Sequence, residues 1–183
     1  ITDKWTKKTD MPTRRSDLST CMINGKIYAF GGWMEGGHIE LSTVEVYDPI
    51  ADKWTKKADM PTLRRNLAVA EVDGKIYVIG GVDNNNMCLP TVEEYDPIAN
   101  KWEIKSNMPQ AKRSSHAISV NGKIYVFGGL DENLNKFDSV HEYDPALDEW
   151  TAKKDMPKGF VISFLYALNS KIYVFGAKRD ANG

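Results

Sequence analysis

The chain has 183 residues, of which 42% are apolar and 27% are charged, a composition typical of a globular domain with enough apolar side chains for a core. Its 24 basic and 25 acidic side chains give a formal net charge of −1, so we expect no nucleic acid and no membrane surface as partner, because both attract basic proteins. No stretch of about 18 apolar residues is present and the 2 cysteines cannot build a disulfide framework, so we expect a soluble chain whose compartment stays unknown.

Four tryptophans set the organisation of the chain. Trp5, Trp54, Trp102 and Trp150 are separated by 49, 48 and 48 residues, and Met-Pro, Lys-Ile-Tyr, Gly-Gly and Tyr-Asp-Pro recur with the same period. Several markers that share one period of about 48 residues indicate a repeat array. The repeats are expected over approximately residues 11–57, 60–105, 108–153 and 156–177. Residues 2–8 are expected to be the outer strand of a split blade, that is, of a sheet whose strands come from both ends of the chain.

The second repeat predicts four strands in chain order. Leu67–Val72 alternates imperfectly between apolar and polar residues, and Ile76–Ile79 is apolar throughout and too short for a helix. Asp73-Gly74 between them predicts a two-residue hairpin turn. Thr91–Tyr95 is the third strand, and the polar Lys101–Lys105 suits an outermost edge strand. Each repeat is therefore predicted as a four-stranded antiparallel meander, whose strands we call a, b, c and d.

A single meander of this size cannot bury both of its faces, so neighbouring meanders must stack face to face, and radial repetition of such sheets is a β-propeller. A glycine pair ends strand b in three repeats, where blades crowd together, and a Trp follows each Tyr of Tyr-Asp-Pro by seven residues. These motifs resemble Kelch repeats over essentially the whole chain. The resemblance implies an all-β fold, a β-propeller of four-stranded antiparallel blades of Kelch type, with about four blades in this chain.

Two arrangements of the ring stay open. Residues 2–8 predict a d strand, and residues 159–177 supply only strands a and b of a fourth blade. The chain starts at Ile1 with no leader-like segment after it, so we expect a processed or excised piece. In the first arrangement it is part of a larger ring, completed by further sequence or by self-association with another copy. In the second it forms a compact ring of four blades with an imperfect closing blade.

The meander topology places the b–c loops and the d–a connections on one rim, and loops that vary on a rigid scaffold commonly bind ligands. In the first three repeats the fourth position after the Met of Met-Pro is basic, and the fifth is Arg or Ser. In Kelch domains that recruit acidic peptides, Arg and Ser at the start of strand a line the pocket, and the resemblance assigns Ser16, Arg65, Arg113 and Ser114 to that role. The candidate ligand-binding residues of this rim are Arg15, Ser16, Arg64, Arg65, Lys112, Arg113, Ser114, Trp33, His38, Asn85 and Asn133.

The same basic side chains have a structural alternative. They can lay their stems along the blades and pair with Glu35, Asp83, Asp131 or Glu132 of adjacent loops, which would leave a neutral rim without a ligand. The loop cysteine Cys88 is expected to be a mildly reactive thiol.

Signatures of catalysis and metal binding are missing from the sequence. The three histidines lie in different repeats without metal-ligand spacing, and no serine-nucleophile or phosphate-loop motif is present. We therefore expect a non-catalytic binding module for a protein or peptide segment, with an acidic segment favoured, and no catalytic residue, metal or cofactor. The alternative is a carbohydrate-active Kelch propeller, an acidic-sugar isomerase or a lectin-like module, with His38 or Glu35 opposite the arginines. A purely architectural array is the third possibility.

Overall fold

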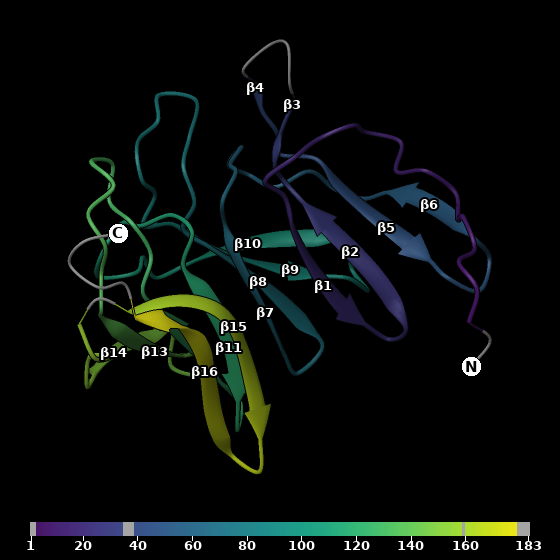
Figure 1. The fold of residues 1–183 in the computed structure, drawn as a ribbon. Coiled ribbons are helices and arrows are strands. Elements are labelled where there is room, and N and C mark those ends of the chain that lie inside the picture. The colour runs from purple at the N-terminus through teal and green to yellow at the C-terminus, as the bar shows by residue number, and fades with distance from the viewer. Residues whose placement is uncertain (1–2, 35–38, 159, 179–183) are drawn as a thin grey trace.

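The computed structural model describes residues 3–34, 39–158 and 160–178, which form strands, turns and loops and contain no helix. Accordingly, none of the residues in these ranges belongs to a helix that could cross a membrane. The sheets follow one another in chain order, each turned relative to the one before (Figure 1).

Three consecutive repeats each form a four-stranded antiparallel sheet, as the sequence predicts. The first blade consists of β1 (Ser19–Ile23), β2 (Lys26–Phe30), β5 (Val44–Asp48) and β6 (Lys53–Lys56). The second consists of β7 (Ala68–Val72), β8 (Lys75–Ile79), β9 (Val92–Asp96) and β10 (Lys101–Lys105). The third consists of β11 (His116–Val120), β12 (Lys123–Phe127), β13 (Val140–Asp144) and β14 (Glu149–Lys153).

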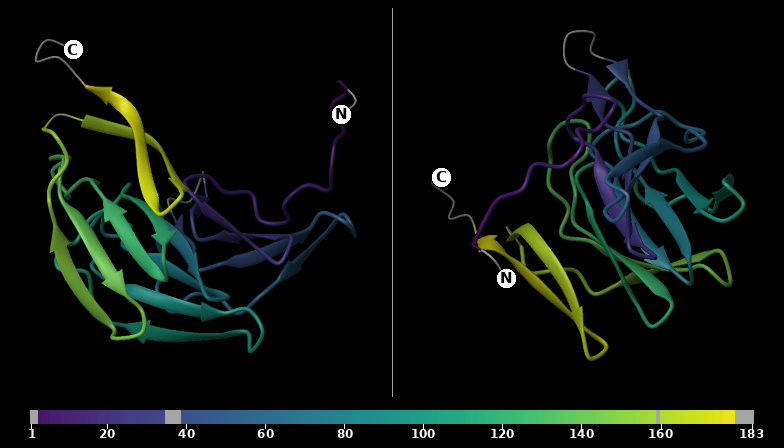
Figure 2. Two further views of the ribbon diagram at one scale, coloured as in Figure 1. Left: turned by 90° about the horizontal axis from the view of Figure 1, so that it is seen from below. Right: turned by 90° about the vertical axis from the view of Figure 1, so that its right-hand side faces the viewer.

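The inner strand of each blade lies against that of the next, in the order β1, β7, β11 and β15 (Phe160–Leu168). Figure 2 shows that the blades follow an arc, which stays open between the fourth sheet and the N-terminal segment. This is a propeller in which the described sheets do not close a ring. The described sheets therefore agree with the partial ring, and within the described residues they do not close a compact ring of four blades.

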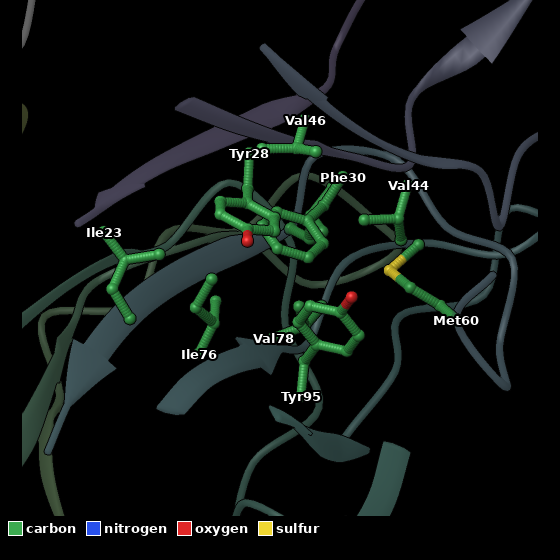
Figure 3. Close-up of a cluster of buried hydrophobic side chains, with 10 residues drawn as sticks. Ile23, Tyr28, Phe30, Val44, Val46, Met60, Ile76, Val78 and Tyr95 are labelled. Atoms are coloured by element: carbon green, nitrogen blue, oxygen red, sulfur yellow. The ribbon is translucent and has the colours of Figure 1, made fainter. Parts of the chain in front are cut away.

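The core lies between blades rather than within them. One cluster joins Tyr28 and Phe30 of the first blade to Ile76, Val78 and Tyr95 of the second, as Figure 3 shows. A second cluster joins the other face of the second blade to the third in the same way. The second blade is therefore covered on both faces, which explains why its strand b is apolar throughout.

A hydrogen-bonded clamp ties each blade to the segment before it. In the second blade Tyr95 Oη donates to Asn100 Oδ1 at 2.7 Å, and the same oxygen accepts the Ala58 amide at 2.9 Å. Trp102 Nε1 then donates to the Ala58 carbonyl at 3.0 Å. The equivalent sets are Tyr47, Asp52, Trp54 and Thr9, and Tyr143, Asp148, Trp150 and Ser106. The recurring aromatic residues thus fill the space between blades, as expected. Their hydrogen bonds also hold each blade at a set distance from the segment before it.

The fourth sheet departs from the repeat. It contains only β15 and β16 (Lys171–Lys178), the two strands that the sequence predicts for it. In blade two the pairing breaks at the glycine pair and resumes at a single bridge between Arg65 and Val82. In the fourth sheet Ala177 replaces the second glycine, and the pairing runs on to the strand ends with a register shift after Ile162.

The N-terminal segment has no strand partner within the described chain. Residues 3–8 are not assigned to a strand, and Trp5 is fully exposed. Thr9 nevertheless occupies the position of Ala58 and Ser106 in the clamp, as a residue just after a d strand would. The split blade that residues 2–8 would complete stays a prediction.

Replacing Gly80 with Ala is expected to cost much more stability than replacing Gly74 with Ala. Both glycines have positive φ, 62° and 81°, so each substitution carries backbone strain of about 1–2 kcal/mol. A Cβ on Gly80 would also lie 2.5 Å from the Lys112 carbonyl oxygen of the next blade, whereas nothing lies within 4 Å of one on Gly74. We expect a loss of at least about 3 kcal/mol for Gly80→Ala in urea unfolding. Equal losses in the two variants would show that neighbouring blades can separate to admit a methyl group.

Candidate ligand-binding rim

A short bridge fixes the start of strand a on this rim in three successive blades. The paired residues are Ser16 with Trp33, Arg65 with Val82, and Arg113 with Leu130. Each pair lies just beyond the glycine pair that ends strand b, where the chain turns sharply with φ values of 62° and 100° at Gly80 and Gly81. Ser16, Arg65 and Arg113 therefore occupy equivalent places in the three blades, as the repeat alignment predicts.

The residue after each bridge links its blade to the next. Asp17, Asn66 and Ser114 all have left-handed backbone conformations, with φ of 53°, 51° and 52°. The Asn66 amide donates to the Asp17 carbonyl at 3.0 Å, and the Ser114 amide donates to the Asn66 carbonyl at 2.8 Å. These hydrogen bonds run across the blades and hold the rim residues side by side.

The side chain four positions after the Met of Met-Pro is buried in all three blades. The ligand-facing expectation for Arg15, Arg64 and Lys112 is therefore wrong. Successive residues of an extended segment point to opposite sides, and only one of two neighbours can face the rim. Arg64 has no exposed surface, and its Nη1 donates to the carbonyl oxygens of Gly80 at 2.9 Å and Thr91 at 3.2 Å.

Two of these cations are each paired with a buried carboxylate of their own. Arg64 Nη2 lies 2.6 Å from Glu93 Oε1, and Arg15 Nη2 lies 3.0 Å from Glu45 Oε2. Burial lowers the pKa of both arginines, and the adjacent carboxylates act in the opposite direction. The structural alternative is therefore correct for these two residues, but the carboxylates come from strand c and not from the adjacent loops.

The side chain five positions after that Met does face the rim, and the two arginines at this position, Arg65 and Arg113, converge. Arg65 Nη2 donates to Asn86 Oδ1 at 3.4 Å, and Arg113 Nη1 donates to the same oxygen at 3.0 Å. Both arginines are partly exposed, and Asn86 is an exposed residue of the b–c loop between β8 and β9. In the described ranges Arg113 has no carboxylate within salt-bridge distance.

Arg65 is held more firmly than Arg113. Its Nε donates to Glu40 Oε1 at 3.0 Å, and its guanidinium lies over the Trp33 ring at 5.7 Å. Glu40 is only 6% exposed and its Oε2 has no hydrogen-bond partner in the described structure. Trp33 and Glu40 belong to a hairpin of β3 (Trp33–Met34) and β4 (Ile39–Glu40) in the first b–c loop. The Glu40 amide donates to Asn84 Oδ1 at 3.0 Å, so the first two b–c loops support each other.

The remaining candidates have mixed outcomes. Ser16 and Ser114 are exposed at the start of strand a, beside the arginines. Asn85 and Asn133 are exposed too, but their amides donate to Asp83 and Asp131 in tight turns. His38 lies outside the described residues. Sequence reasoning missed Asn86 and Glu40. The signal that the sequence offers for Asn86 is its position as the last of three consecutive asparagines.

A hollow of about 820 Å³ extends along the inner strands from this rim. Asp17, Asn66, Ser114, Ser115 and His116 are among the residues that line it. Ser115 is buried and its Oγ has no hydrogen-bond partner in the described structure. Burial lowers the pKa of His116, so its imidazole is neutral at pH 7. The hollow thus has a mixed polar and apolar lining with little charge, and Arg65 and Arg113 are the residues that precede Asn66 and Ser114 of this lining.

In the described ranges the side chains that could bind a metal are dispersed, and the loop thiol is buried. Within the described ranges, no three His, Cys, Asp or Glu side chains are grouped so that they could hold a metal ion. Cys88 is buried, its Sγ donates to the Leu130 carbonyl at 3.5 Å, and burial raises the pKa of its thiol. The expectation of a mildly reactive thiol is therefore wrong, because a raised pKa disfavours the nucleophilic thiolate.

Comparisons with known proteins agree with this architecture. The profile of the Attractin/LZTR1 β-propeller family matches residues 2–182. The chain belongs to that family. A solved structure described as "Structure of YjhT" superimposes on the Attractin/LZTR1-type propeller of this chain with a TM-score of 0.77 and 19% sequence identity. The match covers 86% of this chain and 58% of that one, so this propeller spans little more than half of the solved chain. No curated protein matches the sequence.

Two arginines of this propeller are expected to differ in how much they contribute to stability. Arg64→Met leaves Glu93 as an unpaired buried charge and should cost about 3–5 kcal/mol of unfolding free energy. Arg113→Met removes a partly exposed side chain that has no carboxylate within salt-bridge distance in the described ranges, and should cost about 1 kcal/mol or less. Urea unfolding measures both, and the double variant Arg64→Met/Glu93→Leu should recover much of the first loss. Similar losses for Arg64→Met and Arg113→Met would contradict the difference in burial and pairing.

Proposed function

We propose that this chain is a non-catalytic recognition module that binds a carboxylate-bearing protein segment at the rim described above. The observation that carries the proposal is the convergence of Arg65 and Arg113, from adjacent blades, on the single neutral oxygen of Asn86. Two partly exposed guanidinium groups directed at one acceptor form a fork that a carboxylate can bridge.

A carboxylate would replace a weak acceptor with a strong one. The hydrogen bonds from arginine to Asn86 have one ionised partner, and a carboxylate would supply an ionised acceptor as well, with bidentate geometry. Asn86 lies on an exposed loop, so its side chain can turn away at little cost. Arg113 gains most, because no carboxylate of the described chain lies within salt-bridge distance of it.

The surroundings favour a peptide over a reaction centre. Ser16 and Ser114 offer exposed hydroxyl groups on either side of Arg65, which suits recognition of a polar segment. Glu40, the carboxylate that contacts a rim arginine, is buried and already paired with Arg65, so it is not placed to act as a general base. His38 and Glu35, the expected general acid or base of a sugar-processing enzyme, lie outside the described residues.

Binding is expected to need both arginines. The test titrates a short glutamate-rich peptide into the protein by calorimetry, with the glutamine-substituted peptide and glucuronate as comparison ligands. Arg65→Gln and Arg113→Gln should each weaken binding of the acidic peptide about 10- to 100-fold, since each removes charge-assisted hydrogen bonds worth about 1.5–3 kcal/mol. Arg14→Gln changes the charge equally at an exposed arginine with no part in the fork, and should change affinity less than about twofold.

Two results would count against the proposal. Binding of the acidic peptide that is unaffected by both rim substitutions would place recognition elsewhere. Binding of glucuronate with no binding of either peptide would favour the carbohydrate-active alternative, which shares the carboxylate but needs a compact ligand.

A further inference from the structure

The buried cation next to the rim has a different partner in the third blade. In the first two blades the pairs are Arg15 with Glu45 and Arg64 with Glu93. The positions one repeat later are Lys112 and His141, so the third blade buries two basic side chains where the others bury an ion pair. The repeats act as internal references, because the same backbone hydrogen bond joins the glycine turn to the start of strand c in all three: Gly31 to Thr43, Gly80 to Thr91 and Gly128 to Ser139.

Lys112 lacks the neutralising contact of its equivalents. It has no exposed surface, and its Nζ donates to Ser139 Oγ at 3.0 Å. The Phe137 ring lies 5.5 Å from that nitrogen, and Ser139 Oγ donates in turn to Gln110 Oε1 at 2.7 Å. Burial lowers the pKa of Lys112 to about 8, and the negative charge of Asp155 acts against this decrease.

His141 is exposed to only 8%, and its Nδ1 is buried without a hydrogen-bond partner in the described structure. Its ring stands edge-on to Trp150 at 6.4 Å between centroids. Burial and the positive charge of Lys112 both lower its pKa, and Asp155 is the group that opposes them. A protonated His141 would therefore be a second buried cation beside the first.

We propose that the third blade is a pH-sensing element, in which proton uptake by His141 beside Lys112 loosens the segment that carries Arg113 and Ser114. The path is short. The Lys112 carbonyl accepts the Gly81 amide at 3.0 Å, and the Ser114 amide donates to the Asn66 carbonyl at 2.8 Å. A displaced Lys112 thus disturbs the contact between the second and third blades and, next to it, the start of strand a.

The sign follows from the direction of each shift. A base whose pKa is lowered on folding binds its proton more readily in the unfolded chain, so stability falls as the pH falls below the unfolded pKa. For His141 that window lies below about pH 6.5. For Lys112 it lies between about 10.5 and about 8, in the same direction. Carboxylates such as Glu142, with a pKa of about 2, titrate well below the window of His141.

The experiment measures urea unfolding of the full chain between pH 7 and pH 5. Across this range the unfolding equilibrium constant of the wild type should rise by roughly five- to tenfold more than that of His141→Gln, which cannot take up the proton. Lys112→Arg/His141→Glu, which installs a third Arg–Glu pair, should likewise show the weaker dependence. The reciprocal variant Arg64→Lys/Glu93→His should gain a similar dependence in the second blade. His116→Gln is the control for the other described histidine and should leave the contribution of His141 in place.

Two direct measurements keep the test independent of how well the variants fold. In the wild type the imidazole signals of His141 should titrate below the ordinary range of histidine by NMR. Amide exchange at Arg113 and Ser114, corrected for the intrinsic pH effect, should speed up on acidification more than exchange at Arg65 and Asn66, whose amides make the equivalent hydrogen bonds in the second blade. Ordinary titration of His141, or equal pH dependence in wild type and His141→Gln, would overturn the proposal. Neither readout involves a ligand, so the link to binding rests on the proposed function while the sensor itself does not.

Discussion

The constraint on which the rest depends is that strand b of every repeat carries apolar side chains on both faces. A sheet built from such strands has no stable state alone, because each buried Ile, Val or Tyr contributes about 1.5–3 kcal/mol only when the neighbouring blade covers it. Tyr95, Ile76 and Val92 are fully buried, and the first two lie in the core shared with the preceding blade while Val92 lies in the core shared with the following one. Each repeat must therefore present complementary faces to both neighbours, and this keeps the spacing markers of the sequence constant.

Constancy of the packed parts leaves variation to one rim. The Tyr–Asx–Trp clamp and the glycine turns recur in three blades with nearly identical hydrogen bonds, so they have little freedom to differ. The b–c loops meet no such restriction, and the first contains a hairpin while the second and third contain Asx turns. The recognition proposed for Arg65 and Arg113 is consistent with this division, since the rigid blades position these side chains next to the variable b–c loops.

The repeat markers allowed the strands and their order to be predicted, because side-chain alternation and Asn-Gly turns act locally. The observed β8 and β9 differ from the expected strands by one residue at each affected end. The orientation of Arg64 and Arg65 could not be predicted in this way. At the start of strand a the register is set by a single bridge beyond the glycine turn, and no hydrophobic alternation reports it. The continuous pairing of β15 with β16 escaped prediction as well, since it follows from the loss of one glycine at Ala177.

The buried arginines of the first two blades matter for geometry more than for net charge. A buried ion pair gains little overall because desolvation offsets its attraction. Arg64, however, joins the carbonyl oxygens at the end of strand b and the start of strand c, so its planar fork closes the base of the b–c loop. Lys112 has one compact ammonium group, and its hydrogen bond goes to the side chain of Ser139. The base of the third loop therefore lacks the bond to two backbone carbonyl oxygens that Arg15 and Arg64 provide in the first two. A second positive charge in the third blade would have fewer hydrogen bonds to break.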